Sequence, residues 1–355
     1  MSMSSRTCSS EPCLYPRPAQ WLKGRTVGRG SHGSIDLALD KATGGLFVIK
    51  SAESESGILC LENEAEILQT LDSPHIVKCL GKDISKGSAR KANLFMEYMA
   101  GGSLADVMGQ FGGRLDETVI RLYTREILLG LEYLHGNGIV HCDLKCKNVL
   151  LGSSGEVKLA DFGCSQRRTS QRREKDSLRH PFGGSPLWMA PENLRSENKF
   201  GPDFASDIWS LGCTVIEMAT GQLPWAGEIS DNIILKIVRG EDKPSFPRHL
   251  SEEGLDFLDK CLNRDPRKRW KAAELLRHPF VLQNPKDNFK YASSSSSSSS
   301  PASVLDKSVF PESDCSDDED ESHEARPPFR IPFSMLSEKN TLEDQQEEEE
   351  WITVR

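Results

Sequence analysis

The sequence predicts an α+β protein in which a small β-rich region is followed by a larger helical region. Three observations lead to this prediction. Short β-like runs broken by glycines fill residues 21 to about 82. From residue 103 onward, apolar residues recur at helical spacing. After residue 281 the composition changes to serine-rich and acidic sequence, which is typical of disorder. We therefore expect a flexible segment at 1–20, a folded domain at 21–281 and a disordered tail at 282–355.

The β-rich region contains five strand-like runs and one helix. The predicted strands are Arg25–Gly28, Ser34–Asp40, Leu46–Ser51, Ile76–Leu80 and Asn93–Tyr98. The helix is expected at Ile58–Leu71, between the third and fourth strands, where apolar residues recur every three or four positions. This arrangement indicates one sheet with a single helix packed against it.

The second region is dominated by helices. Asp116–Gly136 is the clearest, because its apolar residues follow intervals of three and four and a glycine ends the pattern. Ala205–Thr220 is apolar on almost every face, which predicts a buried helix. Three shorter helices are expected at Ile229–Arg239, Glu252–Leu262 and Lys271–Leu276. The chain shows no internal repeats.

The charge of the chain is concentrated in its tail. The net charge is −9, yet residues 286–355 hold 7 Lys and Arg against 17 Asp and Glu, so the folded domain is near neutral. This balance does not indicate nucleic-acid binding. No apolar run is long enough to span a membrane, and the ten cysteines form no C-x-x-C pair. We expect a cytosolic or nuclear protein with reduced thiols, and the sequence leaves the oligomeric state open.

A glycine-rich loop, Gly28-Arg-Gly30-Ser-His-Gly33, lies between two strand-like runs. Glycines allow backbone N–H groups to approach phosphates closely. Two interpretations compete: a dinucleotide-binding fold and a loop that covers the phosphates of ATP. The first requires a helix directly after the glycines, whereas the residues that follow, beginning at Ser34, are strand-like. The pattern therefore favours the ATP loop.

Lys50 ends the next apolar strand, one hairpin after the glycines, where its ammonium can pair with the α- and β-phosphates of ATP. The helix that follows offers Glu62, Glu64 and Glu66 as partners. Only Glu64 has an apolar stripe at i+3, i+4 and i+7, so it faces inward and is the expected partner of Lys50. The other two glutamates are expected to face solvent.

The strongest signal is His141-Cys-Asp143-Leu-Lys145-Cys-Lys-Asn148. Its residue types suit phosphoryl transfer: Asp143 can accept the proton of an attacking hydroxyl, Lys145 can neutralise the transferring phosphoryl, and Asn148 can bind Mg²⁺. Eighteen residues after Asp143 comes Asp161-Phe-Gly, whose carboxylate at a strand end suits a hard cation such as Mg²⁺. A structural role is expected for Glu192 in Ala190-Pro-Glu192, as an ion-pair partner of Arg269.

The order of these motifs over residues 21–281 resembles the protein-kinase family. The resemblance implies a two-lobed fold with ATP between the lobes and a protein phosphotransferase activity that uses ATP and Mg²⁺. It also implies a hinge at Glu97–Met99, Met96 as gatekeeper, Leu150 under the adenine, and Asp207 as the helix carboxylate that braces the catalytic loop. Lys145 matches the serine/threonine type. The implied nucleotide-binding residues are Val27, Gly28, Gly30, Gly33, Ile35, Val48, Lys50, Met96, Glu97, Met99 and Leu150; the catalytic ones are Lys50, Glu64, Asp143 and Lys145; the metal ligands are Asn148 and Asp161.

A narrower resemblance is to the MEKK-like mitogen-activated protein (MAP) kinase kinase kinases, and within them to a short plant subgroup linked to stress signalling. It depends on Trp21-Leu-Lys-Gly, Phe95-Met-Glu-Tyr-Met-Ala-Gly-Gly-Ser-Leu104, Trp188-Met-Ala-Pro-Glu192, Ile139-Val-His-Cys-Asp-Leu-Lys145 and the terminal Trp351-Ile-Thr-Val-Arg355. Membership implies MAP kinase kinases as substrates. The alternatives are a serine/threonine kinase of another cascade and a pseudokinase scaffold. The acidic tail, with Trp351-Ile352 near its end, is either a docking element for a regulator or plain solvated chain.

Three positions depart from the family pattern. Cys142 replaces the arginine that usually precedes the catalytic aspartate and binds a phosphate on the activation segment. Its absence puts ordinary activation-loop control in doubt but leaves the chemistry of Asp143 intact. Ile35 stands where valine is common, and Ser185 replaces threonine while keeping the hydroxyl.

Overall fold

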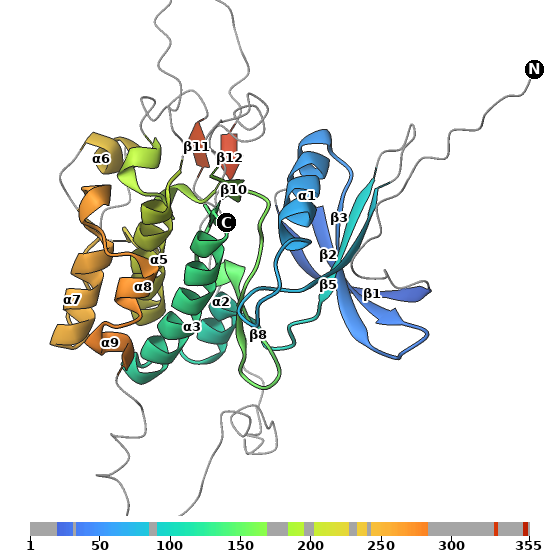
Figure 1. Cartoon of the computed structure of the whole chain (residues 1–355), viewed down its shortest axis with the longest axis horizontal. Helices are drawn as coiled ribbons and strands as arrows, with labels where there is room; N and C mark the ends of the chain where they lie inside the picture. Colours follow the sequence, from blue (N-terminus) through green and yellow to red (C-terminus); the bar gives the residue numbers. More distant parts are fainter. Residues whose placement is uncertain are drawn as a thin grey trace, which may run out of the picture.

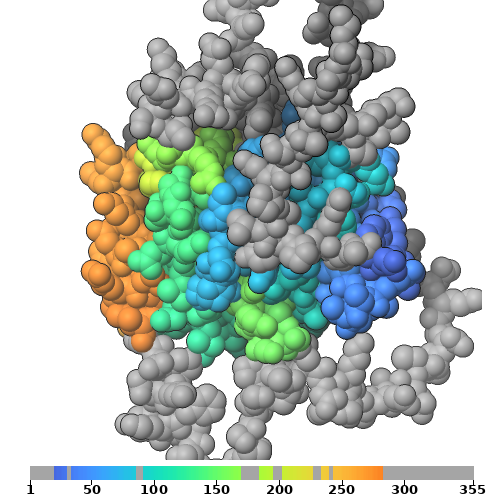
Figure 2. All heavy atoms as spheres, turned by 45° about the vertical axis from the view of Figure 1, so that its right-hand side comes forward, coloured from blue at the N-terminus to red at the C-terminus, as the bar shows by residue number. Residues whose placement is uncertain are grey.

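A computed structural model describes residues 20–30, 33–84, 91–168, 184–194, 202–226, 233–239 and 243–282, and two short strands at 330–332 and 351–353. Two lobes are visible within these ranges, a β-rich lobe and a helical lobe (Figure 1). In space-filling form the N-terminal residues gather on one side and the C-terminal helices on the other (Figure 2). The predicted two-lobed α+β fold is confirmed.

The N-terminal lobe is a five-stranded antiparallel sheet in the order β1-β2-β3-β5-β4. Its strands are β1 (Trp21–Gly30), β2 (Gly33–Asp40), β3 (Leu46–Ala52), β4 (Cys79–Ile84) and β5 (Ala92–Glu97). Because side chains alternate along a strand, β3 turns Phe47 and Ile49 to one face and Val48 and Lys50 to the other. The first face packs on Phe95 in a small separate cluster, and the second faces the helix and the main core.

The helix of this lobe, α1 (Glu55–Leu68), begins three residues before the predicted start at Ile58. The side chain of Ser54 accepts a hydrogen bond from the N–H of Gly57 at 3.2 Å, which caps the first turn. At the other end the backbone tightens: the N–H of Thr70 bonds to the carbonyl of Ile67 and that of Leu71 to Leu68, so the helix ends before Leu71.

The predicted strand Ile76–Leu80 was wrong in its position, because β4 begins at Cys79 and runs to Ile84. Ile76 instead forms a parallel bridge with Leu159 of the other lobe, and the N–H of Val77 bonds to the carbonyl of Leu159 at 3.0 Å. The two apolar residues that suggested a strand therefore join the lobes.

The C-terminal lobe is built around two long helices, α3 (Glu117–Gly136) and α5 (Phe204–Thr220). Both were predicted within one residue of these bounds. The stripe of α3, which includes Ile120, Ile127, Leu131 and Leu134, is fully buried, and α5 is buried on nearly every face. Gly221 ends α5 with φ of 68°, and a β-carbon there would lie 1.9 Å from the carbonyl oxygen of Gly113, so only glycine fits.

Smaller elements complete this lobe. They are β6 (Gly102–Ser103), α2 (Leu104–Gln110), β7 (Ile139–Val140), β8 (Val149–Leu151), β9 (Val157–Leu159), β10 (Gln166–Arg167), α6 (Ile233–Arg239), α7 (Glu252–Cys261), α8 (Ala272–Leu275) and α9 (Pro279–Leu282). The three shorter helices predicted here correspond to α6, α7 and α8; the first four residues predicted for α6, 229–232, lie outside the described residues. No helix in the described ranges is both long and apolar enough to cross a bilayer.

The flexibility predicted for 1–20 and the disorder predicted for most of the tail concern residues that, apart from residue 20, lie outside the described part of the chain. Within the tail, β11 (Arg330–Pro332) and β12 (Trp351–Thr353) pair in antiparallel fashion, with Ile331 opposite Ile352. The two consecutive residues Trp351 and Ile352 therefore lie in β12.

Candidate active site

Lys50 lies between two carboxylates. Its Nζ is 2.7 Å from Oε2 of Glu64 on α1 and 2.7 Å from Oδ1 of Asp161, which follows β9. The predicted pair of Lys50 and Glu64 is thus present. Glu64 is 1% exposed, whereas the side chain of Asp161 is 45% exposed. The partly buried lysine and the buried glutamate hold each other in place, and the aspartate remains accessible to a ligand.

The electrostatics of this trio keep Lys50 and Asp161 ionised. Burial by itself would lower the pKa of Lys50, but the charges of Asp161 and Glu64 outweigh it and raise that pKa. Burial would raise the pKa of Asp161, and the ammonium of Lys50 instead lowers it well below its ordinary value. The pKa of Glu64 is raised by burial, with Lys50 opposing the shift. The result is a fixed ammonium beside an accessible carboxylate.

Asp161 has a left-handed backbone with φ of 65°, which is uncommon for a non-glycine residue. The residue after it, Phe162, is fully buried, and its N–H donates to Oε1 of Glu64 at 3.2 Å. The ring of Phe162 lies 5.0 Å from that of His141, whose Nε2 contacts the carbonyl of Ala160 at 3.1 Å. These contacts fix the path of the backbone from the end of β9 through Asp161.

The predicted catalytic residues Asp143, Lys145 and Asn148 lie together. Nζ of Lys145 is 3.1 Å from Oδ2 of Asp143 and donates to Oγ of Ser185 at 2.5 Å. Nδ2 of Asn148 donates to the same Oδ2 and to the backbone carbonyl of Asp143, both at 2.8 Å. Asp143 is therefore oriented by two donors, and the amide oxygen of Asn148 is left for another ligand.

Asp207 on α5 braces this loop, as the resemblance implied. Its Oδ2 accepts the N–H of His141 at 2.8 Å, and its Oδ1 accepts the N–H of Cys142 at 3.0 Å. Nε2 of His135 is 2.9 Å from the same carboxylate. Cys142 has φ of 69°, so the carboxylate holds the chain in a strained turn directly before Asp143.

The implied nucleotide-binding residues lie along the N-terminal lobe and the connection to the other lobe. Val27, Gly28 and Gly30 lie on β1, Gly33 and Ile35 on β2, Val48 and Lys50 on β3, Met96 and Glu97 on β5, Met99 just after it, and Leu150 on β8. Ile35 is opposite Lys50, and Val48 is opposite Met96. Residues directly opposite in an antiparallel pair share a face, so Ile35, Val48 and Met96 lie on the face that carries Lys50.

Two of these positions have further constraints. A β-carbon at Gly33 would lie 1.9 Å from the carbonyl oxygen of Ser51, so only glycine allows β2 to approach β3 there. The side chain of Glu97 accepts from Nζ of Lys158 at 2.7 Å and from the N–H of Lys78 at 2.6 Å. The carboxylate of Glu97 is engaged with these partners, so a nucleotide bound here would meet the backbone of Glu97 rather than its side chain.

These residues fit ATP with Mg²⁺. Magnesium prefers oxygen ligands and is commonly bound by one or two side chains together with substrate phosphates. Asp161 offers an ionised carboxylate and Asn148 an amide oxygen, and a hydrogen bond of 2.9 Å from the N–H of Ala160 to the carbonyl of Asn148 joins their two segments. Lys50 supplies a cation for phosphate oxygens. Bound Mg²⁺ would neutralise charge on the phosphates, while Asp143 orients the attacking hydroxyl.

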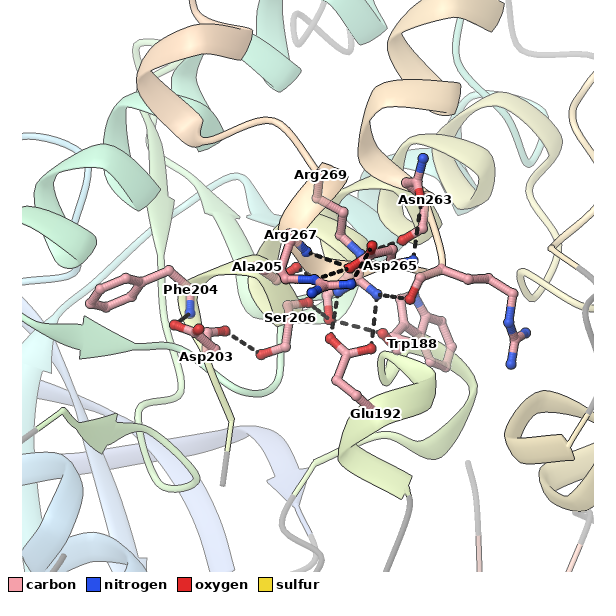
Figure 3. Close-up of polar contacts among 12 residues, drawn as sticks. Trp188, Glu192, Asp203, Phe204, Ala205, Ser206, Asn263, Asp265, Arg267 and Arg269 are labelled. Atoms are coloured by element: carbon pink, nitrogen blue, oxygen red, sulfur yellow. Dashed lines mark hydrogen bonds and ion pairs between the residues drawn. The ribbon is translucent and has the colours of Figure 1, made fainter. Parts of the chain in front are cut away.

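A second predicted ion pair, between Glu192 and Arg269, lies in the helical lobe (Figure 3). The guanidinium of Arg269 binds both carboxylate oxygens of Glu192, at 2.6 and 2.8 Å. It also donates to the carbonyls of Ala205 and Asn263. The side chain of Arg269 is fully buried, so this pair has a structural role.

Three residues that support the site were not predicted from the sequence. Asn63, next to Glu64, contacts the backbone after Asp161. His135 contacts Asp207, and Glu217 accepts from the N–H of Cys146 at 3.1 Å and from Nε1 of Trp188 at 2.9 Å. A glutamate inside the predicted buried helix α5 was a usable signal for Glu217. The other two carry no pattern, because a polar residue on a partly buried helix face is common.

Comparison with known proteins gives a consistent result. The sequence model of the family described as "Protein kinase domain" matches residues 21–281. Mitogen-activated protein kinase kinase kinase 18 of Arabidopsis thaliana is 41% identical over 272 residues, which cover 74% of this chain and 77% of that protein. Number 17 of the same plant is 39% identical over 297 residues, covering 82% and 77%. Mitogen-activated protein kinase kinase kinase A of Dictyostelium discoideum is 39% identical over 282 residues, and this chain covers 29% of its length.

Proposed function

The chain belongs to the protein kinase family and is a protein serine/threonine kinase, and from this premise we propose that it acts as a MAP kinase kinase kinase whose substrates are MAP kinase kinases. The observation that supports this step is the match to a compact Arabidopsis relative of that name, of which the chain covers 77% at 41% identity. A role in a plant stress-signalling cascade, a cytosolic or nuclear location and regulators bound by the tail are parts of the same proposal.

The active-site geometry suits a hydroxyl substrate of the serine or threonine type. Lys145 contacts both Asp143 and Ser185, so the cation lies beside the carboxylate that would receive the hydroxyl proton. Lys50 and Asp161 provide the charges that ATP and Mg²⁺ need. This geometry is common to kinases of several cascades, and only the substrate distinguishes among them.

The test is transfer of radiolabelled phosphate from Mg-ATP to a panel of catalytically inactive MAP kinase kinases. The controls are Asp143→Asn, which removes the proton acceptor, and Lys50→Met, which removes the phosphate-binding cation. We expect labelling of at least one panel member on a serine or threonine of its activation segment, and none with either control. Labelling of a generic protein without any panel member would place the kinase in another cascade and overturn the proposed substrate class.

A further inference from the structure

Asn63 on α1 makes hydrogen bonds to the backbone that follows Asp161. Its Nδ2 is 3.0 Å from the carbonyl oxygen of Ser165, 3.1 Å from that of Gly163 and 3.4 Å from that of Phe162. An amide nitrogen carries two hydrogens, so two donors serve three acceptors. A single side chain thus contacts three of the four carbonyls between residues 162 and 165.

The neighbouring residue, Glu64, binds a backbone N–H of the same segment, whereas Asn63 binds its carbonyls. Glu64 accepts the N–H of Phe162 through Oε1, while its Oε2 binds Lys50. The segment is also joined to the catalytic loop, because Oγ of Ser165 donates to the carbonyl of His141 at 2.9 Å. The consecutive residues Asn63 and Glu64 therefore connect α1 to both N–H and carbonyl groups of the segment Phe162–Ser165. This segment directly follows Asp161, the expected metal ligand.

Asp161 needs such support because its backbone is strained. A left-handed conformation at a non-glycine residue persists only where the surrounding structure fixes it. Lys50 holds the side chain of Asp161, but that side chain must also be free to bind a cation. The contacts of Asn63 act on the backbone one to four residues further on, so they can fix the conformation without occupying the carboxylate.

We propose that Asn63 is a positioning residue that holds the segment Phe162–Ser165 on α1 and thereby sets the carboxylate of Asp161 for Mg²⁺. Movement of α1 and placement of the metal ligand are then linked by a side chain in addition to the pair of Lys50 and Glu64. The inference depends on the kinase activity alone and is independent of the substrate class proposed above, so a generic peptide substrate suffices for its test.

Three substitutions separate the amide's role from its bulk. Asn63→Asp keeps the shape but places an ionised carboxylate against three carbonyl oxygens, Asn63→Ala removes the group, and Asn63→Gln retains an amide. Ser56→Asp, at an exposed position on the same helix, is the matched control for added negative charge. We expect Asn63→Asp and Asn63→Ala to lower kcat and to raise the Mg²⁺ concentration for half-maximal rate, each by about 10-fold or more, as for residues that orient metal ligands.

The peptide KM should stay within about twofold in these variants, since the hydrogen bonds described for Asn63 go to the backbone of residues 162–165. Asn63→Gln should recover part of the rate lost in Asn63→Ala, and Ser56→Asp should behave as wild type. Melting temperatures are measured alongside. If Asn63→Ala and Asn63→Asp keep the wild-type kcat and Mg²⁺ dependence, or if they lose rate only in proportion to folded protein, the inference is wrong.

The pH profile of the aspartate variant gives a second readout that general packing would not change. Facing carbonyl oxygens, the introduced carboxyl has a raised pKa, and its protonated form can donate one hydrogen bond. The ratio of its rate to the wild-type rate should therefore rise as pH falls from 8 to 6, while that of Asn63→Ala stays flat. The nearby titratable groups Lys50, Cys60, Glu64, Asp161 and Cys164 are common to all variants and cancel in the ratio. A flat ratio for Asn63→Asp would also contradict the inference.

Discussion

Asp36 is a buried carboxylate in β2, on the face opposite to Ile35. It is 1% exposed and accepts from Oγ1 of Thr26 at 2.7 Å, from Oγ of Ser34 at 3.2 Å and from Nζ of Lys23 at 2.8 Å. The pairing of β1 with β2 is irregular on both sides of Thr26. The carboxylate therefore holds β1 at an irregular stretch that leads directly into the glycine-rich loop.

We expect Asp36→Asn to lower the free energy of unfolding by about 1.5–3 kcal/mol at pH 7, because hydrogen bonds to a charged group are lost. The measurement is urea unfolding followed by tryptophan fluorescence. Lys23→Ala is the companion variant, and it should cost less, since the lysine is 56% exposed and an exposed partner contributes little. Equal stability of Asp36→Asn and wild type would contradict this role.

The pH dependence of this effect has a defined sign. Burial opposes ionisation of Asp36, but its hydrogen bonds and the charge of Lys23 lower its pKa below the ordinary value of 3.8. A carboxyl with a lowered pKa in the folded state contributes stability above the unfolded pKa, and this stability is lost as pH falls through the folded pKa. The difference between wild type and Asp36→Asn should stay constant from pH 8 to 5 and shrink only below about pH 4.

At the scale of single residues, some side-chain contacts could be predicted from the sequence and others could not. Helical spacing selected Glu64 among three glutamates, because only that position shares a face with an apolar stripe, and the ion pair with Lys50 is present. Asp36 and Asn63 were not foreseen. Their partners are a neighbouring strand and backbone carbonyls distant in sequence, and neither kind of contact leaves a periodic pattern.

The short strand β10 illustrates how an element is held by contacts outside the motifs. It pairs with β7, and the N–H of Arg168 just after it donates to the carbonyl of Gly138 at 2.8 Å. The guanidinium of Arg168 is 2.8 Å from Oδ1 of Asp203, the N-cap residue of α5, and lies over the ring of Phe204. These contacts hold the start of the activation segment in place. They do so although Cys142 replaces the arginine that usually binds a phosphate on that segment.

Arg168→Ala should therefore loosen β10 without unfolding the lobe. Both partners are about half exposed, and such pairs typically contribute less than about 1 kcal/mol, so the melting temperature should fall by no more than about 4 °C. Hydrogen exchange at the amides of residues 166–168 should quicken. Asp203→Asn, which keeps an N-cap side chain on α5 but removes the charge, should reproduce the exchange effect. Unchanged exchange in both variants would show that strand pairing alone suffices.

The positions of elements were predicted to different degrees. The long helices α3 and α5 followed from apolar periodicity over many residues, which averages out local exceptions. The ends of α1 were displaced because its start depends on the cap at Ser54 and its end on the backbone turn at Thr70. The displacement of β4 has a tertiary cause, since Ile76 and Val77 bond to Leu159 in the other lobe.

At the scale of the molecule, the order of motifs predicted two lobes but not how they are joined. Connections between the lobes include the chain after Glu97, the carboxylate of Glu97 on Lys158, and the bridge between Ile76 and Leu159. The trio of Lys50, Glu64 and Asp161 adds a connection through the active site itself. Because the contacts through the active site include an expected metal ligand, we expect binding of ATP and Mg²⁺ to be coupled to the relative position of the lobes.

The pair of Glu192 and Arg269 joins segments of the helical lobe that are far apart in the sequence (Figure 3). We expect Glu192→Gln to lower the free energy of unfolding by about 3–5 kcal/mol, because it leaves the charge of a fully buried arginine unpaired. For a domain of this size that is a fall in melting temperature of about 6–20 °C, measurable by calorimetry. Arg269→Met should cost a similar amount, since the carbonyls of Ala205 and Asn263 lose their donor.

The double variant distinguishes a coupled pair from two independent losses. In Glu192→Gln with Arg269→Met no buried charge remains, so its cost should be smaller than the sum of the two single costs by at least about 1 kcal/mol. Strict additivity would mean that the two side chains stabilise the lobe separately, through backbone contacts alone. Activity per folded molecule should stay near the wild-type value in all three variants, because none of the residues contacts Lys50, Asp143 or Asp161. A specific loss of kcat would instead show that this ion pair also supports the catalytic loop, through α5.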